Sequence, residues 1–385
     1  MTSPAYSVAR VVAPKVALHL ALHRASLQAE ADRHPASLLP DAEVIEALVD
    51  AAFWASLRRE EGYAPRISLA YLPPHADVDP LIFERPLALD SLGLARLAPA
   101  VERPGVHLGV GRAGAGAGAR DLVVWGTTRT IPPFCFVVEV VSPGLLVLKH
   151  RPRFDSRKFV NVAVLESDQI KIIDERASLM PDCPALVSSL LGFDAPRSVS
   201  GAPNVLVQLA VSMRKHGRGG ALLVVPAASE SWRASIVHPI AYAVNPAYGR
   251  LADLLSQEAG AEHRHEWLEA LGRAVESVAG LTAVDGATIV TDSYNLLAFG
   301  AKIRRRQNGT PVEQLLVTEP IEGGVAERMA PGQLGGTRHL SAAQFVTDQK
   351  DALALVASQD GHFTIFAWSP CENLVHAHRV ETLLL

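Results

Sequence analysis

The sequence predicts a chain of two domains with mixed α and β structure: an N-terminal α+β domain, then an α/β domain with a central mixed sheet flanked by helices. Two observations support this fold class. Short β-rich runs crowd residues 66–167, whereas helical patterns alternate with apolar strands in the second half. A stretch rich in Pro, Ser and Gly separates the two regions. We therefore predict domains at 1–180 and 203–385, joined by a linker at 181–202.

Composition narrows the class of protein. The 385 residues are 49% hydrophobic and 20% charged, and the net charge is −4. This balance is typical of a globular protein and gives no reason to expect nucleic acid as a partner. The three cysteines form no CxxC pair, which favours a reduced compartment. The N-terminal 27 residues make a poor signal peptide, and no apolar run of roughly 18 residues predicts a membrane span. We expect a cytoplasmic protein without a membrane partner.

In the first domain, residues 41–60 repeat apolar positions at helical spacing after an acidic start and predict a helix. The runs rich in β-branched and apolar residues predict strands at 66–72, 121–128, 135–141, 145–150 and 161–167. Ser142-Pro143-Gly144 separates two of these runs as a hairpin turn would. We expect a mostly antiparallel sheet.

In the second domain, two amphipathic patterns that end at glycine predict helices at 205–217 and 266–280. Another helix opens with "SAAQFV" at residue 341. Apolar runs predict strands within 219–226, 281–290, 295–303, 351–361 and 362–368. Helices that alternate with strands argue for a sheet covered by helices.

Four conspicuous stretches have simpler explanations than chemistry. "GRAGAGAGAR" (111–120) precedes a strand rather than a helix, so it is a flexible loop and no dinucleotide loop. The histidines of 262–266 and 371–379 lack the ligand spacing of a zinc site. The arginines 304–306 fit a solvated turn between strands, with an added positive field as the alternative.

Three stretches of the second domain carry side chains suited to phosphate and metal. Asp285 precedes Gly286, a residue that lets a ligand approach the backbone. "GGTRH" (335–339) offers amides, a hydroxyl, a guanidinium and an imidazole at a helix start, where phosphate is favoured. Ser358 and Asp360 follow a strand end, in a turn. Two acids beside a phosphate cradle are what a divalent metal that bridges phosphates requires. Taken singly, each stretch also fits a turn aspartate, a helix cap or a hairpin tip.

The order of these motifs resembles the diadenylate cyclase domain family. The matching positions are Asp285-Gly286-Ala287, Gly336-Thr337-Arg338-His339 and Ser358-Gln359-Asp360, and "GGALLVV" (219–225) is similar to the family's first core strand. The resemblance covers roughly residues 200 to 375. The first 175 or so residues look like the sensor-like domains that some bacterial members carry.

The resemblance implies that two ATP molecules, held by two face-to-face copies of the chain, condense into cyclic di-AMP with Mg²⁺ or Mn²⁺. An unknown ligand or protein would act on the N-terminal domain. Catalysis would be mostly positioning and charge stabilisation. The implied roles fall on the motif residues: catalytic, Asp285, Arg338 and His339; substrate-binding, Gly286, Ala287, Leu296, Ile303, Gly336, Thr337 and Ser358; metal-binding, Asp285 and Asp360.

The chain departs from the family pattern twice. Leu340 stands where the family has a second arginine, and Gln359 replaces one acid of the Ser-acid-acid turn. A lost charge-assisted hydrogen bond costs about 1.5–3 kcal/mol, so activity would be reduced if the bond acted on the transition state. These departures leave two alternatives open: a catalytically weak module that binds ATP or a dinucleotide, and a cyclase with a different nucleotide product. A third alternative is an interaction scaffold whose glycine loops are structural.

Overall fold

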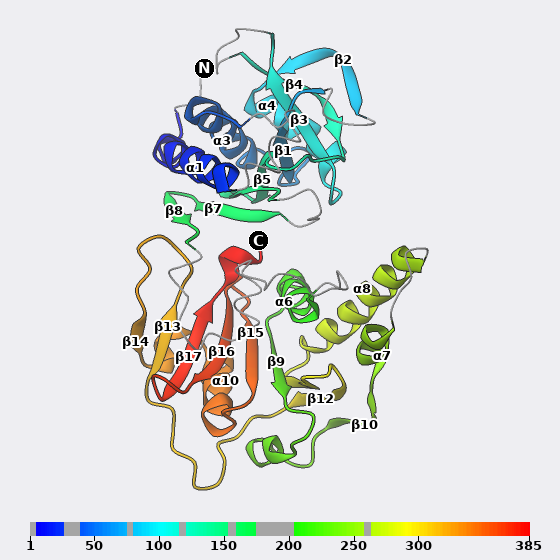
Figure 1. Ribbon diagram of the computed structural model, residues 1–385, viewed down its shortest axis with the longest axis vertical. Coiled ribbons are helices and arrows are strands. Elements are labelled where there is room, and N and C mark those ends of the chain that lie inside the picture. The colour runs from blue at the N-terminus through cyan, green and yellow to red at the C-terminus, as the bar shows by residue number, and fades with distance from the viewer. Residues whose placement is uncertain are drawn as a thin grey trace. The chain divides into compact units, whose positions relative to one another are not determined.

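The computed structural model describes residues 5–26, 39–74, 80–114, 121–152, 159–174, 204–257 and 263–385. The chain divides into two compact units, Met1–Ile173 with Leu385, and Asp174–Leu384. The linker predicted at 181–202 lies outside the described residues. Each unit is built on one mixed sheet with helices packed against it (Figure 1), so the predicted fold class is confirmed. Among the described residues, no helix is both long and apolar enough to cross a membrane.

The N-terminal unit holds an eight-stranded sheet in the order β2-β4-β3-β1-β5-β6-β7-β8. The strand bounds are β1 Ile67–Tyr71, β2 Leu81–Ala88, β3 His107–Arg112, β4 Leu122–Thr128, β5 Phe136–Ser142, β6 Leu145–His150, β7 Val160–Glu166 and β8 Gln169–Ile172. The pair β1 and β3 is parallel and the other neighbours are antiparallel. The sheet is therefore mostly antiparallel, as expected.

Three helices of this unit, α1 (Ser7–Ser26), α3 (Ala42–Ser56) and α4 (Ser91–Val101), bury their apolar sides in one core with the sheet. Only α3 was predicted from the sequence. The helix α1 contains Pro14, and α4 contains Gly93 and Pro99. Because Pro and Gly normally interrupt helices, the sequence around them does not predict a helix.

The C-terminal unit holds a nine-stranded mixed sheet in the order β10-β12-β11-β9-β15-β16-β17-β13-β14. The strand bounds are β9 Gly220–Val225, β10 Tyr242–Tyr248, β11 Ala287–Thr291, β12 Leu296–Ala301, β13 Leu315–Thr318, β14 Glu327–Met329, β15 Leu353–Ala357, β16 Phe363–Ser369 and β17 Leu374–Arg379. The helix bounds are α6 Val205–Lys215, η3 Ser231–Ser235, α7 Arg250–Ser256, α8 Arg264–Leu281, α9 Pro331–Leu334, α10 Thr337–Asp348 and η5 Glu381–Leu383.

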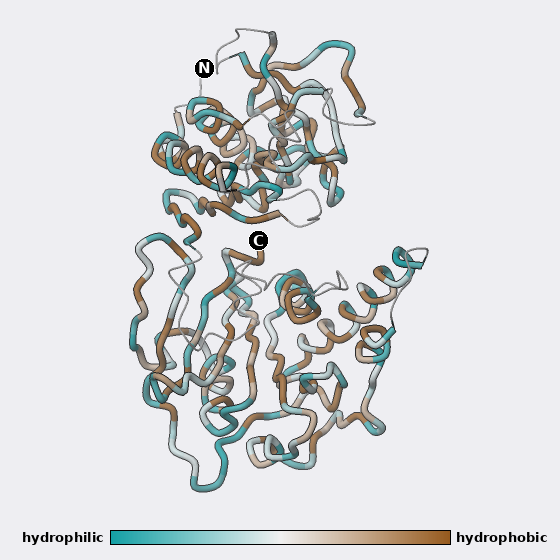
Figure 2. Tube along the Cα trace, in the orientation of Figure 1, coloured by the Kyte–Doolittle hydropathy of each residue, from teal (hydrophilic) through white to brown (hydrophobic). Residues whose placement is uncertain are grey.

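Helices cover both faces of this sheet. The helices α6, α7 and α8 pack with the β9 side chains Leu222 and Val224, whereas α10 packs with Leu223 and Val225 on the other face. Every residue of β9 is buried, as expected of a central strand with a helix on each side. In Figure 2 the trace of α8 alternates between brown and teal along its length, as an amphipathic helix does.

The register of three neighbouring strands sets the position of the site. The strands β9 and β11 are parallel, with Ala221 opposite Ala287, so both begin at the same edge of the sheet. The antiparallel strand β12 ends there, with Ala301 opposite Ala287. Segments from three separate parts of the chain therefore meet at this edge.

Candidate functional site

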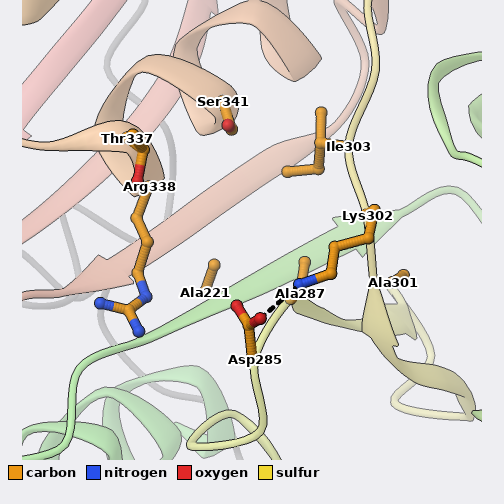
Figure 3. A pocket seen from close by; sticks show the side chains of 10 residues that line it. Ala221, Asp285, Ala287, Ala301, Lys302, Ile303, Thr337, Arg338 and Ser341 are labelled. Atoms are coloured by element: carbon orange, nitrogen blue, oxygen red, sulfur yellow. Dashed lines mark ion pairs between the residues drawn. The ribbon is translucent and has the colours of Figure 1, made fainter.

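A pocket lies at this edge of the C-terminal sheet, on the face that α10 covers (Figure 3). Its volume is about 200 Å³. The lining residues come from the starts of β9 and β11, the end of β12 and the first turns of α10: Ala221, Asp285, Gly286, Ala287, Ala301, Lys302, Ile303, Thr337, Arg338 and Ser341. Two of the three predicted motifs, "DGA" and "GTRH", thus contribute to one hollow.

Asp285 stands in the turn that precedes β11, and its side chain is 91% exposed. Its Oδ2 lies 2.7 Å from Nζ of Lys302. The hydrogen bond from Lys302 and the charge of that ammonium, with a smaller contribution from Arg338, hold the pKa of Asp285 below its usual range. The carboxylate is therefore ionised at neutral pH and open to a ligand.

Gly286 is required by the packing of the sheet itself. Its φ is +121°, and a Cβ there would lie 2.4 Å from the carbonyl carbon of Gly300. The sequence interpretation assigned this glycine to the close approach of a ligand. The structure shows close approach by the neighbouring strand β12, at a point where the register of β11 and β12 shifts. Any residue with a side chain would force Asp285 and the start of β11 away from β12.

The start of α10 contributes the groups suited to binding phosphate. Gly336 is the N-cap and has no capping side chain, and Thr337, Arg338 and Ser341 line the hollow. The first N–H groups of a helix have no intrahelical partner and carry the positive end of the helix dipole. This end of α10 is therefore suited to an anion.

The guanidinium of Arg338 extends over the start of β9 (Figure 3). A Cβ on Gly219 would lie 3.0 Å from Nη1 of Arg338 and 3.3 Å from Cγ of Gln359. Gly219, which has φ +70°, thus leaves room for the arginine. Gln359, one of the two departures from the family pattern, stands beside the same arginine. The other departure, Leu340, is 45% exposed and does not line the pocket.

His339 does not line the pocket, although the motif suggested a catalytic role. Its side chain is buried, and a Cβ on Gly335 would lie 2.5 Å from the His339 Nδ1. Burial, followed by the charges of His362 and Arg379, lowers the pKa of His339. The imidazole therefore packs against Gly335, in the loop ahead of α10. Because its pKa is lowered, it is neutral at pH 7.

The predicted third motif lies outside the pocket lining. Ser358 Oγ accepts a hydrogen bond from the backbone N–H of His362 (3.2 Å), which closes the turn between β15 and β16. Asp360 is exposed at the tip of that turn. Leu296 is also outside the lining, because it is buried in the core against α7 and α8. Ile303 does line the pocket.

The donor groups fit a metal that arrives with its ligand better than a resident one. The described residues contain no group of three or more His, Cys, Asp or Glu side chains that could hold a metal ion. The lining supplies one carboxylate, that of Asp285. Mg²⁺ in phosphate sites is commonly held by one or two carboxylates together with substrate oxygens, and a single carboxylate such as Asp285 is compatible with that mode of binding.

Four lining residues were not identified from the sequence: Ala221, Ala301, Lys302 and Ser341. Lys302 matters most, because it adds a second cation opposite Arg338. One signal was present in the sequence: "AKI" (301–303) puts a charged residue directly after an apolar strand. Such a lysine is common on protein surfaces, so the pattern alone did not identify it.

The stretches set aside earlier stay outside the site. Gly111 and Arg112 end β3 and Leu122 begins β4, so the glycine-rich segment joins two antiparallel strands; residues 115–120 lie outside the described part. His376 and His378 are buried on β17, and both hydrogen-bond with the hydroxyl of Thr318. Arg304, Arg305 and Arg306 are exposed beyond β12.

Comparison with known proteins gives a result for the N-terminal unit. Residues 34–129 match the model of a family described as "Probable sensor domain DACNV". This region of the chain is therefore similar to a probable sensor domain. No curated protein matches the chain. Among solved structures, the crystal structure of a hypothetical membrane spanning protein from Bacillus cereus is 15% identical, with a TM-score of 0.28, over 50% of this chain and 70% of that one.

Proposed function

We propose that the C-terminal unit is a diadenylate cyclase that condenses two ATP molecules into cyclic di-AMP, and that the N-terminal unit regulates it as a sensor. The observation that carries the proposal is the shared pocket of Asp285 and Arg338. Two motifs far apart in the sequence place a carboxylate, a guanidinium and a helix start around one hollow (Figure 3). This combination of groups suits the triphosphate of a nucleotide.

Each residue has a definite task in this reaction. The N–H groups at the start of α10 and the guanidinium of Arg338 bind phosphate oxygens and stabilise the charge that develops on them. Asp285 would accept the proton of the attacking ribose hydroxyl and would also hold the Mg²⁺ or Mn²⁺ that accompanies the nucleotide. Such an ion supplies further positive charge to the phosphates. Thr337 and Ser341 position the triphosphate within the hollow.

A second copy of the chain is needed to complete the product. The 3′-hydroxyl of each ATP attacks the α-phosphate of the other, each new ester bond displaces pyrophosphate, and two such steps close the ring. One pocket supplies half of this reaction, so two copies must meet face to face. We expect the rate of product formation to rise more steeply than the protein concentration when copies are scarce.

The sensor role rests on the similarity of residues 34–129 to a probable sensor domain. We propose that an unidentified ligand or protein acts on this unit and changes the output of the cyclase. Comparing product formation by the full chain with and without candidate ligands tests this part of the proposal.

Product analysis tests the enzyme assignment. Purified protein is incubated with ATP and Mn²⁺ or Mg²⁺, and cyclic di-AMP is measured by mass spectrometry. The Asp285→Asn variant should lose about a hundredfold or more of the rate, because general acid–base groups contribute roughly 10²–10⁴-fold. Asp351→Asn is the matched control, since Asp351 is an exposed aspartate of the same unit outside the pocket lining. A rate that is equal in both variants contradicts the assignment.

A second function is favoured by two observations. Asp285 supplies the only carboxylate among the described lining residues, and Gln359 stands beside Arg338 in place of an acid. A pocket so equipped could bind ATP or a dinucleotide and turn it over weakly or not at all. ATP binding that Arg338→Ala weakens, without cyclic di-AMP under any metal condition, would identify this binding module.

A further inference from the structure

The backbone of Lys302 and Ile303 is paired with a neighbouring segment, which fixes the position of Lys302 at the pocket. The carbonyl oxygen of Lys302 accepts a hydrogen bond from the N–H of Val237 (2.8 Å), and Ile303 forms a β-bridge with Ile236. The segment that follows β12 is therefore anchored to the chain beyond η3. The lysine side chain points from this anchored segment to Asp285 (Figure 3).

The charges of the pocket do not cancel. The lining contains two cations, Lys302 and Arg338, and one anion, Asp285. In Figure 3 the carboxylate of Asp285 lies between the ammonium and the guanidinium. With Asp285 neutralised by one cation, the charge of the other remains for an anionic ligand.

The ion pair of Lys302 and Asp285 can be broken at little cost in free energy. The two side chains are 54% and 91% exposed, respectively. Exposed ion pairs contribute little stability, because water screens them and two flexible side chains must be ordered. A phosphate group with more than one negative charge can therefore attract the ammonium away from a single carboxylate at little cost.

We propose that Lys302 is a built-in cation of this pocket: it neutralises Asp285 in the free protein and binds the nucleotide phosphates together with Arg338, so that ATP binds without a divalent metal. This inference rests on the proposed function and assigns a further phosphate-binding residue to the same site. Under it, the metal is needed for the chemical step but not for the binding of the nucleotide.

Calorimetric titration of the full chain with ATP tests the proposal, once in EDTA and once in excess Mg²⁺. In EDTA the wild type should bind ATP, and Lys302→Met should weaken binding by about tenfold or more, the range of a lost charge-assisted hydrogen bond. Lys302→Arg should restore most of the affinity. In Mg²⁺ the effect of Lys302→Met should be smaller, because the ion supplies positive charge at Asp285.

Lys215→Met is the matched control. Lys215 is an exposed lysine of α6, which packs on the opposite face of the sheet, and its loss changes the net charge equally. If the wild type binds ATP only with Mg²⁺, or if Lys302→Met binds as Lys215→Met does in EDTA, the built-in cation is overturned and the nucleotide site remains. If ATP binds under neither condition, the proposed function fails as well.

Discussion

The glycine at position 219 provides a test of the pocket's geometry. Gly219 and Gly217 both have positive φ, +70° and +65°. A Cβ on Gly217 would meet nothing within 4 Å, whereas a Cβ on Gly219 would lie 3.0 Å from Nη1 of Arg338. Alanine at either position costs about 1–2 kcal/mol of stability, because a left-handed backbone crowds its Cβ. Only alanine at 219 should also displace the guanidinium.

The displaced arginine should lower the affinity for ATP. A hydrogen bond to a charged group contributes about 1.5–3 kcal/mol, so its partial loss corresponds to roughly a tenfold weaker Kd. We expect this change in Gly219→Ala and no change in Gly217→Ala, measured by calorimetric titration. In urea unfolding, Gly219→Ala should lose at least as much stability as Gly217→Ala, because its Cβ would also lie 3.3 Å from the carbonyl oxygen of Ala357.

A double-mutant cycle separates the contact from a general distortion of the loop. In the Arg338→Ala background, Gly219→Ala should have no further effect on ATP affinity, because the side chain it displaces is gone. Equal ATP affinities of Gly219→Ala and Gly217→Ala would contradict the role of the contact between Gly219 and Arg338. An effect of Gly219→Ala that is unchanged without the arginine would contradict it as well.

Two further predictions concern stability. Phe345 is fully buried on α10. The substitution Phe345→Ala should lower the free energy of unfolding by about 3–5 kcal/mol in a urea titration. Leu340 is exposed on the same helix, so Leu340→Ala should stay within about 0.5 kcal/mol of wild type. His107 is buried in the N-terminal unit, where burial and then the charge of Lys149 lower its pKa to about 4. As the pH falls from about 6.5 towards 4, His107 takes up a proton in the unfolded chain but stays neutral in the folded one. The free energy of unfolding should therefore fall by up to about 1.4 kcal/mol per pH unit. In urea titrations at a series of pH values, His107→Gln should reduce this slope.

Five strands and three helices of the second unit could be predicted because their apolar patterns are strong, whereas β13, β14, β17 and α7 were not predicted. Strands β9, β11, β12, β15 and β16 and helices α6 and α8 lie where the sequence predicted them. The helix α10 begins at Thr337, four residues before the predicted start at Ser341. The edge strand β10 was missed, since nearly all its residues are exposed and it contains Pro246, so it shows no alternation. The strand β2 was missed for the same reason, with Pro86 inside it. Periodicity reports burial, and these two strands are barely buried.

The candidate site was predictable where a motif fixes the backbone. Asp285, Thr337 and Arg338 were proposed from motif order, and the structure places all three in one lining. Ser358 was proposed from the same order, but its hydroxyl closes its own turn. Lys302 was missed because its relation to Asp285 depends on the pairing of β11 with β12. Sequence order indicates which residues belong to a motif, whereas the side chains that share a pocket depend on strand pairing.

The hollow itself comes from side-chain size. On the face that α10 covers, Leu223 and Ile289 are paired across β9 and β11, and one step earlier along the same face Ala221 is paired with Ala287. Ala301 of β12 continues this row of alanines. The large pair fills the space beneath α10, and the row of small residues leaves the space that Asp285 and Arg338 surround. Alanine and leucine give the same apolar pattern, so periodicity predicts the strands equally well with or without a pocket. The level at which large residues give way to small ones becomes visible only when the register of all three strands is known.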